Sequence, residues 1–223
     1  MDNDHKNWLD RPALGVRITW WHVAVVLVLA FVIITRLVML DTRAYCHDES
    51  IHAWESWKLY TGQGYVHNPV YHSPFLYHIT ALVYWLFGDN DFTGRLSTSI
   101  AGILIAVMPL FFSRWLGKRG TLLAMVLLAI SPVMMHRSRF IRHDQWAIFF
   151  NMLMLLGIVR YLADRKSRDL YLVAASLSLS FAGKETSYIS VALMGASLAA
   201  VTLWEWLRTG RRRSLTDFAG YDL

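Results

Sequence analysis

Two acidic residues, Asp48 and Glu49, directly follow the first long apolar stretch of the chain. Carboxylates in this position can act as a general base or as metal ligands, which makes both residues candidates for catalysis. The alternative is that they only place negative charge at the N-terminus of a helix in a solvated loop. The pattern of residues leaves both interpretations open.

A second cluster lies in residues 136–144, which read HRSRFIRHD. Arginine binds phosphate through paired hydrogen bonds, so Arg139 and Arg142 indicate a phosphate-bearing ligand. The alternative is that these arginines neutralise lipid headgroups. Asp144 follows them and could orient an arginine or help to hold a divalent cation.

Lys184 and Glu185 interrupt a long apolar region between Leu170 and Trp204. Ionisable residues at bilayer depth are costly and usually face a cavity, so the pair is a candidate substrate-binding element. A simple turn between two helices is the alternative. Histidines also crowd residues 47–78, but their spacing matches no metal motif. We single out His72, which directly precedes Ser73 and Pro74, as a candidate substrate-binding residue.

The composition indicates a membrane protein. Of 223 residues, 55% are hydrophobic and 14% are aromatic, more than a soluble domain usually holds. The single cysteine, Cys46, excludes an internal disulfide and a metal site built from several cysteines. We interpret the net charge of +6 as a topological signal, and we expect no nucleic-acid partner.

Stretches without Asp, Glu, Lys or Arg predict the membrane spans. We expect an all-α integral membrane protein with about six transmembrane helices. The spans are expected at 18–35, 96–113, 121–135, 145–159, 170–183 and 186–204. The stretch at 75–88 is short and rich in aromatic residues, so we expect a helix on the membrane surface there.

The distribution of Lys and Arg supports this topology. With a cytoplasmic N-terminus, the six-span arrangement places 14 of these residues inside and 8 outside. A seven-span arrangement with the N-terminus outside gives the same count, but it separates the two reactive loops across the membrane. The six-span arrangement places both loops outside, and we adopt it.

The long outer loop is expected to contain an amphipathic helix that lies along the membrane. Ile51, Trp54, Trp57 and Leu59 recur at helical spacing, and the turn residues from Thr61 onward end the helix. The whole chain then divides into a cytoplasmic tail at 1–17, a transmembrane domain at 18–207 and a basic cytoplasmic segment at 208–223.

The order of these motifs resembles a known family. The run includes Asp48-Glu49, residues 71–78 (YHSPFLYH), Phe87-Gly88, Arg95-Leu96, Ser131-Pro132, residues 139–144 (RFIRHD) and residues 183–185 (GKE). It is similar to the N-terminal half of GT-C-type membrane glycosyltransferases, which include protein O-mannosyltransferases and lipid A aminoarabinose transferases. The nearest resemblance is to a prokaryotic branch associated with the flipping of lipid-linked sugars in protein glycosylation. It covers about residues 41–206.

The resemblance implies transfer of a sugar from a polyprenyl-phosphate donor to a protein, lipid or glycan acceptor on the extracytoplasmic side of the cell membrane. It implies that Asp48 is the essential acid of the first outer loop, as a base or as a group that orients the acceptor, and that Asp144 is the acid of the second loop, near a metal or the acceptor. It also implies that Arg139, Arg142 and Lys184 are candidates to bind the donor phosphate. Where aminoarabinose transferases carry Glu-Lys, this chain has His72-Ser73, so any metal ligand there would be histidine. Because family members are commonly longer, we expect a fragment or a reduced relative, and a non-catalytic role in handling lipid-linked sugars is the alternative.

Overall fold

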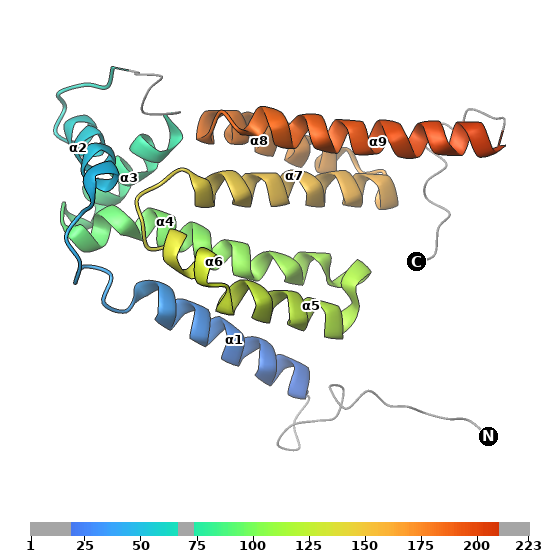
Figure 1. The fold of residues 1–223 in the computed structure, drawn as a ribbon, viewed down its shortest axis with the longest axis horizontal. Coiled ribbons are helices and arrows are strands. Elements are labelled where there is room, and N and C mark those ends of the chain that lie inside the picture. Colours follow the sequence, from blue (N-terminus) through green and yellow to red (C-terminus); the bar gives the residue numbers. More distant parts are fainter. Residues whose placement is uncertain (1–18, 67–73, 210–223) are drawn as a thin grey trace.

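A computed structural model describes residues 19–66 and 74–209, and all of its regular elements are helices (Figure 1). His72, the tail at 1–17 and nearly all of the segment at 208–223 lie outside the described residues. The elements are α1 (Trp20–Leu37), α2 (His47–Tyr60), α3 (Phe75–Phe87), α4 (Asp91–Val107), η3 (Met108–Phe112), α5 (Ser113–Ile130), α6 (Pro132–Arg137), α7 (Asp144–Asp164), α8 (Ser167–Gly183) and α9 (Ser187–Thr209).

Within the described residues, four helical stretches are long and apolar enough to cross a membrane: Trp20–Leu37, Asp91–Ile130, Asp144–Asp164 and Ser187–Arg208. The second stretch contains both α4 and α5, and α5 runs back beside α4 (Figure 1). The predicted class of an all-helical membrane protein is confirmed. The number of six crossings stays a prediction, as does the surface position of the short apolar helix α3.

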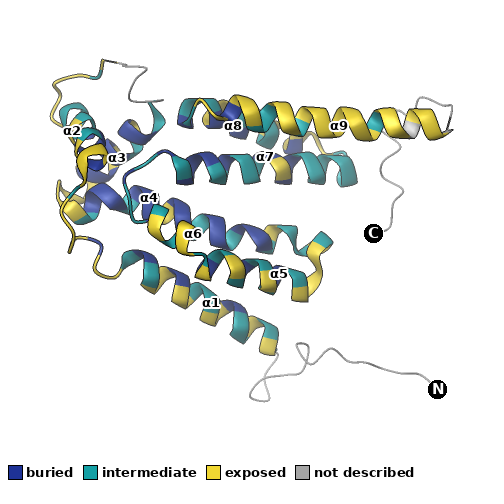
Figure 2. Cartoon of the chain, viewed as in Figure 1, coloured by how far each residue is buried: buried dark blue, intermediate teal, exposed yellow. Residues whose placement is uncertain are grey.

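The outer helices of the bundle bury few of their side chains (Figure 2). In the 18-residue apolar window of each stretch, 6% of the residues are buried for α9 and 17% for α1, against 50% in the stretch that holds α4 and α5. Helices that are apolar on all sides are typical of a lipid environment. The bundle therefore has α4 near its centre and α1 and α9 at its flanks.

One end of the bundle carries α2, α3 and the loops that precede α4 and α7 (Figure 1). The opposite end is held together by different contacts. There the Arg114 guanidinium of α5 lies 2.7 Å from the Asp164 carboxylate of α7, and the indole of Trp21 donates to the carbonyl of Lys118 at 3.3 Å. All candidate site residues in the described chain lie at the first end.

Small and hydroxyl-bearing residues join α7, α8 and α9. A Cβ on Gly157 would lie 2.8 Å from a Val173 methyl carbon, so the glycine allows α7 and α8 to approach closely. The Asn151 amide donates to the Ser190 hydroxyl at 3.0 Å and accepts from the Ser180 hydroxyl at 2.9 Å. These interhelical hydrogen bonds hold the turn between α8 and α9 beside α7.

Two arginines bind the ends of neighbouring helices. The buried guanidinium of Arg36 donates to the carbonyls of Ala129 and Leu128 at the end of α5. The guanidinium of Arg139, in the loop before α7, donates to the carbonyls of Thr35, Val38 and Met39 at 2.7–2.8 Å. Carbonyls at a helix end lack partners within the helix, and both arginines satisfy them.

Helix α2 begins at His47 and ends at Tyr60, close to the predicted limits. It buries a polar side, which includes Glu49, His52 and Ser56, against the rest of the protein. On the predicted apolar side, Trp54 is 54% exposed, whereas Ile51, Trp57 and Leu59 are half-buried. Helical periodicity indicated two sides, and the charged partners of Glu49 decide which one is buried.

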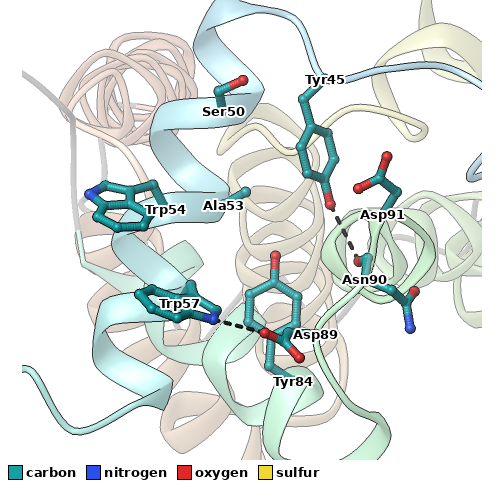
Figure 3. Close-up of a pocket in the computed structure, with 9 residues that line it drawn as sticks. All are labelled: Tyr45, Ser50, Ala53, Trp54, Trp57, Tyr84, Asp89, Asn90 and Asp91. Atoms are coloured by element: carbon teal, nitrogen blue, oxygen red, sulfur yellow. Dashed lines mark hydrogen bonds between the residues drawn. The ribbon is translucent and has the colours of Figure 1, made fainter.

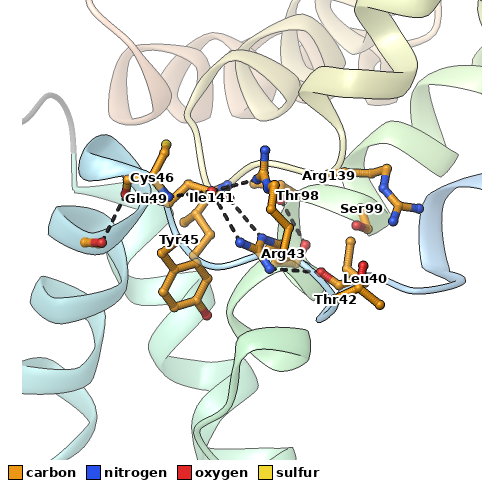
Figure 4. A network of polar contacts seen from close by, with 12 residues as sticks. Leu40, Thr42, Arg43, Tyr45, Cys46, Glu49, Thr98, Ser99, Arg139 and Ile141 are labelled. Carbon is orange, nitrogen blue, oxygen red and sulfur yellow. Dashed lines mark hydrogen bonds and ion pairs between the residues drawn. The ribbon is translucent and has the colours of Figure 1, made fainter.

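The carboxylate of Glu49 is the centre of a buried network (Figure 4). It accepts from the Arg95 guanidinium of α4 at 2.9 Å and from the Arg43 guanidinium at 2.7 Å. It also accepts from the backbone N–H groups of Cys46 and Ile141. Glu49 and Arg95 are both at least 99% buried. One side chain therefore links α2, α4 and the loop that precedes α7.

The network keeps Glu49 ionised. Burial acts to raise the pKa of the Glu49 carboxyl, but hydrogen bonds from Arg95 and Cys46 and the charges of Arg95 and Arg43 outweigh it, so the pKa falls below its usual value. Arg95 also donates to the Leu40 carbonyl at 2.9 Å. The buried pair thus has hydrogen-bond partners as well as opposite charges, which a buried ion pair requires.

We predict that Glu49→Gln destabilises the fold, because it leaves the Arg95 cation buried without a counter-charge. Loss of one partner of a buried pair typically costs about 3–5 kcal/mol. The free energy of unfolding, measured by denaturant titration in detergent micelles, should fall by an amount in this range.

The matched control is Glu55→Gln on the same helix. Glu55 pairs with Lys58 at the surface, so its loss should cost less than about 1 kcal/mol. Equal destabilisation by the two substitutions would contradict the role assigned to the buried pair.

Candidate active site

Four charged side chains from separate parts of the chain meet at the α2 end of the bundle. The Arg142 guanidinium lies 2.7 Å from the Asp48 carboxylate and 3.6 Å from the Asp144 carboxylate. The ammonium of Lys184 also forms an ion pair with Asp144. We call Asp48, Arg142, Asp144 and Lys184 the polar cluster. Three separated stretches of sequence are therefore brought together.

Each member of the polar cluster has a defined support. Asp48 is the second residue of α2, next to the anchored Glu49. Asp144 is the first residue of α7, where the helix dipole favours a negative charge. Lys184 is the first residue after α8. Ser187, at the start of α9, donates through its hydroxyl to the Ser180 carbonyl at 2.8 Å and holds the turn that contains Lys184.

The loop that carries Arg142 is held on both sides. Its residue Ile141 donates through its backbone N–H to Glu49, and Arg139 caps the end of α1. The Ser138 carbonyl accepts from the Ser99 hydroxyl of α4 at 3.0 Å. These bonds fix the backbone before and after Phe140, so Arg142 is presented from a rigid loop.

The polar cluster is accessible from outside the protein. The side chain of Asp48 is 51% exposed and that of Arg142 is 30% exposed, whereas Asp144 and Lys184 are nearer 20%. Arg137, at the end of α6, adds a third cation 3.5 Å from Asp144. Three cations and two carboxylates give the site a net charge of +1, which favours an anionic ligand.

The other predicted site residues lie in different surroundings. Glu49 is buried beneath Asp48, and the Arg139 guanidinium is directed to α1. Glu185 is exposed in the turn between α8 and α9. Arg137 lies in the same HRSRFIRHD run, but nothing in that run distinguishes it from its neighbours before the contacts with Asp144 are known.

An aromatic wall adjoins the polar cluster. The buried rings of His52 and His143 lie 4.9 Å apart, and His52 Nδ1 lies 3.1 Å from the Tyr77 hydroxyl. His143 immediately precedes Asp144. Gln145, on the other side of Asp144, is fully buried, and neither its side-chain amide nitrogen nor its amide oxygen has a hydrogen-bond partner. Sequence patterns gave no signal for this wall, because spacing alone does not pair residues from α2, α3 and α7.

A metal ion bound at the polar cluster would need several His, Cys, Asp or Glu side chains close together as ligands. Within residues 19–66 and 74–209, no three His, Cys, Asp or Glu side chains come together in a metal-binding group. Asp144 and Asp48 instead share the arginine between them. We therefore assign no step of the chemistry to a metal.

Comparison with protein families identifies the chain. Residues 71–215 match the family model described as dolichyl-phosphate-mannose-protein mannosyltransferase. Comparisons with curated proteins and with solved structures gave no match. The matched region covers more than half of the chain and includes Arg142, Asp144 and Lys184. The chain therefore belongs to the dolichyl-phosphate-mannose-protein mannosyltransferase family, a family of membrane glycosyltransferases that use a sugar carried on a polyprenyl phosphate.

Proposed function

We propose that this chain transfers a sugar from a polyprenyl-phosphate carrier to a hydroxyl group of a polypeptide, on the extracytoplasmic side of the membrane. The family description names a protein as acceptor, which supports this acceptor class. The observation that carries the proposal is the polar cluster, in which a carboxylate exposed to solvent lies beside cations that suit a phosphate.

The cations of the polar cluster are proposed to bind the donor phosphate. Arg142 can form paired hydrogen bonds with phosphate oxygens, and Lys184 adds a second positive charge. When the bond between the sugar and the phosphate breaks, negative charge grows on the phosphate oxygen. Fixed cations stabilise this charge more in the transition state than in the bound donor, and this difference lowers the barrier.

Asp48 is proposed as the general base. The acceptor oxygen forms a bond to the anomeric carbon of the sugar, while the bond from that carbon to the phosphate oxygen breaks. The hydroxyl proton passes to the Asp48 carboxylate, and polyprenyl phosphate leaves as an anion. The ion pair between Asp48 and Arg142 is partly exposed to solvent, which weakens it, so a donor phosphate can replace Asp48 at Arg142.

Three further residues, Asp144, Glu49 and Arg139, are proposed to position Asp48 and Arg142. Asp144 contacts Arg142, Lys184 and Arg137, so it can orient the phosphate-binding cations. Glu49 and Arg139 hold the segments that carry Asp48 and Arg142. We therefore place Glu49 and Arg139 behind the site and not in contact with substrate.

Cys46 offers a direct test of the proposed side. It is the only cysteine, it is exposed, and it lies two residues before Asp48. In intact cells a membrane-impermeant maleimide should label it. Lys118→Cys in a Cys46→Ser background reports on the opposite end of the bundle and should react only after lysis. If the Lys118→Cys variant alone were labelled in intact cells, Cys46 would lie on the cytoplasmic side and the proposed topology would be wrong.

Asp48→Asn should remove the carboxylate that accepts the proton. It should leave the fold intact, because the side chain of Asp48 is exposed. General base catalysis contributes about 10²–10⁴-fold, so kcat should fall by at least about 100-fold. The measurement is transfer of radiolabelled sugar from a polyprenyl-phosphate donor to a peptide in proteoliposomes. The control is Asp41→Asn, which changes an exposed acid outside the polar cluster.

Unchanged turnover in Asp48→Asn would remove Asp48 from the mechanism. A wild-type protein that binds donor but transfers nothing to any polypeptide would favour the non-catalytic role.

Arg142→Gln should weaken binding of the donor more than binding of the acceptor. Loss of one charge-assisted contact to phosphate costs about 1.5–3 kcal/mol, so the KM for donor should rise about tenfold or more. Steady-state kinetics with the donor varied at a fixed peptide concentration measure the change. Arg114→Gln removes an exposed arginine at the opposite end and should leave the KM unchanged; a rise of equal size there would contradict the site.

A further inference from the structure

A second hollow lies across α2 from the polar cluster. It has a volume of about 340 Å³ and lies between α2 and the connection from α3 to α4 (Figure 3). Trp57 lines it, and Trp57 follows Asp48 by nine residues. At about 100° per residue, the two side chains leave α2 in opposite directions. The hollow is therefore separate from the proposed reaction site.

Aromatic rings form the walls of the hollow. The indoles of Trp54 and Trp57 stack with their centroids 5.0 Å apart and their planes at 17°. The phenols of Tyr45 and Tyr84 close the other side, and both hydroxyls meet over Gly94. A Cβ at Gly94 would collide with these hydroxyls, so the glycine is needed for the two rings to converge.

The hollow offers carboxylate acceptors for hydrogen bonds, and three of its donors are already in use. The indole N–H of Trp57 donates to the Asp89 carboxylate at 2.8 Å. The Tyr45 hydroxyl donates to the Asn90 carbonyl at 3.4 Å, and the Ser50 hydroxyl donates to the Cys46 carbonyl at 3.0 Å. Carboxylate oxygens, ring faces, the Trp54 indole N–H and the N–H groups of the Asn90 side-chain amide are left for a ligand. The carboxylates favour a ligand that donates hydrogen bonds to them.

The charge of the hollow is negative. The carboxylates of Asp89 and Asp91 lie at its rim, and no Lys, Arg or His is among the residues that line it. A cation gains from both carboxylates and from the faces of the aromatic rings, and tryptophan is the strongest of these partners. A neutral sugar could stack on the rings and donate hydroxyl hydrogen bonds to the carboxylates, but only a cation also gains from their net charge.

We propose that this hollow binds the ammonium or guanidinium group of a lysine or arginine side chain on the acceptor polypeptide. The apolar stem of such a side chain suits the stacked tryptophans, and its charged end suits Asp89 and Asp91. The hollow then selects basic polypeptides, while the polar cluster performs the transfer. The choice of a polypeptide as the ligand rests on the proposed function; the preference for a cation rests on the lining alone.

The test uses the full chain in nanodiscs of phosphatidylglycerol. Two fluorescein-labelled serine-containing peptides of equal length serve as probes, one with a central lysine and one with norleucine at that position. Fluorescence anisotropy measures their dissociation constants without any sugar donor. The variant is Asp89→Asn with Asp91→Asn, because asparagine keeps the shape and can still accept from the Trp57 indole. Asp41→Asn is the control.

Wild-type protein should bind the lysine peptide about tenfold more tightly than the norleucine peptide, as an ammonium over aromatic faces and carboxylates would give. The double variant should lose this preference, and the control should retain it. Higher ionic strength should weaken only the lysine peptide. Equal binding of both peptides by wild-type protein, or a preference that survives in the double variant, would overturn the proposal.

A lipid headgroup is the other source of an ammonium group. Adding phosphatidylethanolamine to the nanodiscs should leave the preference for lysine intact if the acceptor supplies the cation. Loss of the preference on that addition would assign the hollow to lipid and overturn the proposal. Because no turnover is measured, failure of the wild-type protein to transfer sugar would not alter this result, and the two proposals fail separately.

Discussion

The buried ion pair of Glu49 and Arg95 is the contact on which the arrangement of this protein depends. Two opposite charges without solvent are stable only while each remains fully paired, so the segments that supply them cannot drift apart. The carboxylate also accepts the Ile141 N–H, and the guanidinium also binds the Leu40 carbonyl. The segment that holds α2, the central helix α4 and the arginine-bearing loop are thereby positioned by one interaction.

The proposed chemistry depends on this rigidity. Asp48 is the neighbour of Glu49, and Arg142 is the neighbour of Ile141, so the buried carboxylate fixes both sides of the exposed ion pair through one peptide bond each. The exposed pair can then exchange partners without a movement of the backbone. A site that is preorganised in this way avoids the cost of reorganisation during the reaction.

Much of the fold could be predicted from charge-free stretches, because burial of charge in a bilayer is costly and helices must satisfy their own backbone. The approach of Asp48, Arg142, Asp144 and Lys184 was also expected from the alternation of spans. The different roles of adjacent residues were not. Asp48 and Glu49 are equivalent acids in the sequence, and only the 100° between them on α2, with an arginine 46 residues away, separates an exposed carboxylate from a buried one.

The same limit applies to the arginines and to the aromatic residues. Arg139 and Arg142 share a motif, yet the first binds carbonyls of α1, which lie about 100 residues away in the sequence. The hollow beside Trp57 depends on the missing Cβ of Gly94, a contact that no local pattern encodes. Sequence periodicity identifies the sides of α2, but long-range contacts decide what each side meets.

Helix α2 separates the polar cluster from the hollow, with Asp48 on one of its sides and Trp54 and Trp57 on the other. Its buried side is the part that cannot change, while the two outer sides share no residue. Under the two proposals, substitutions among the tryptophans would change which polypeptides bind without disturbing Asp48. The choice of target and the transfer reaction would then be encoded by separate sides of one helix.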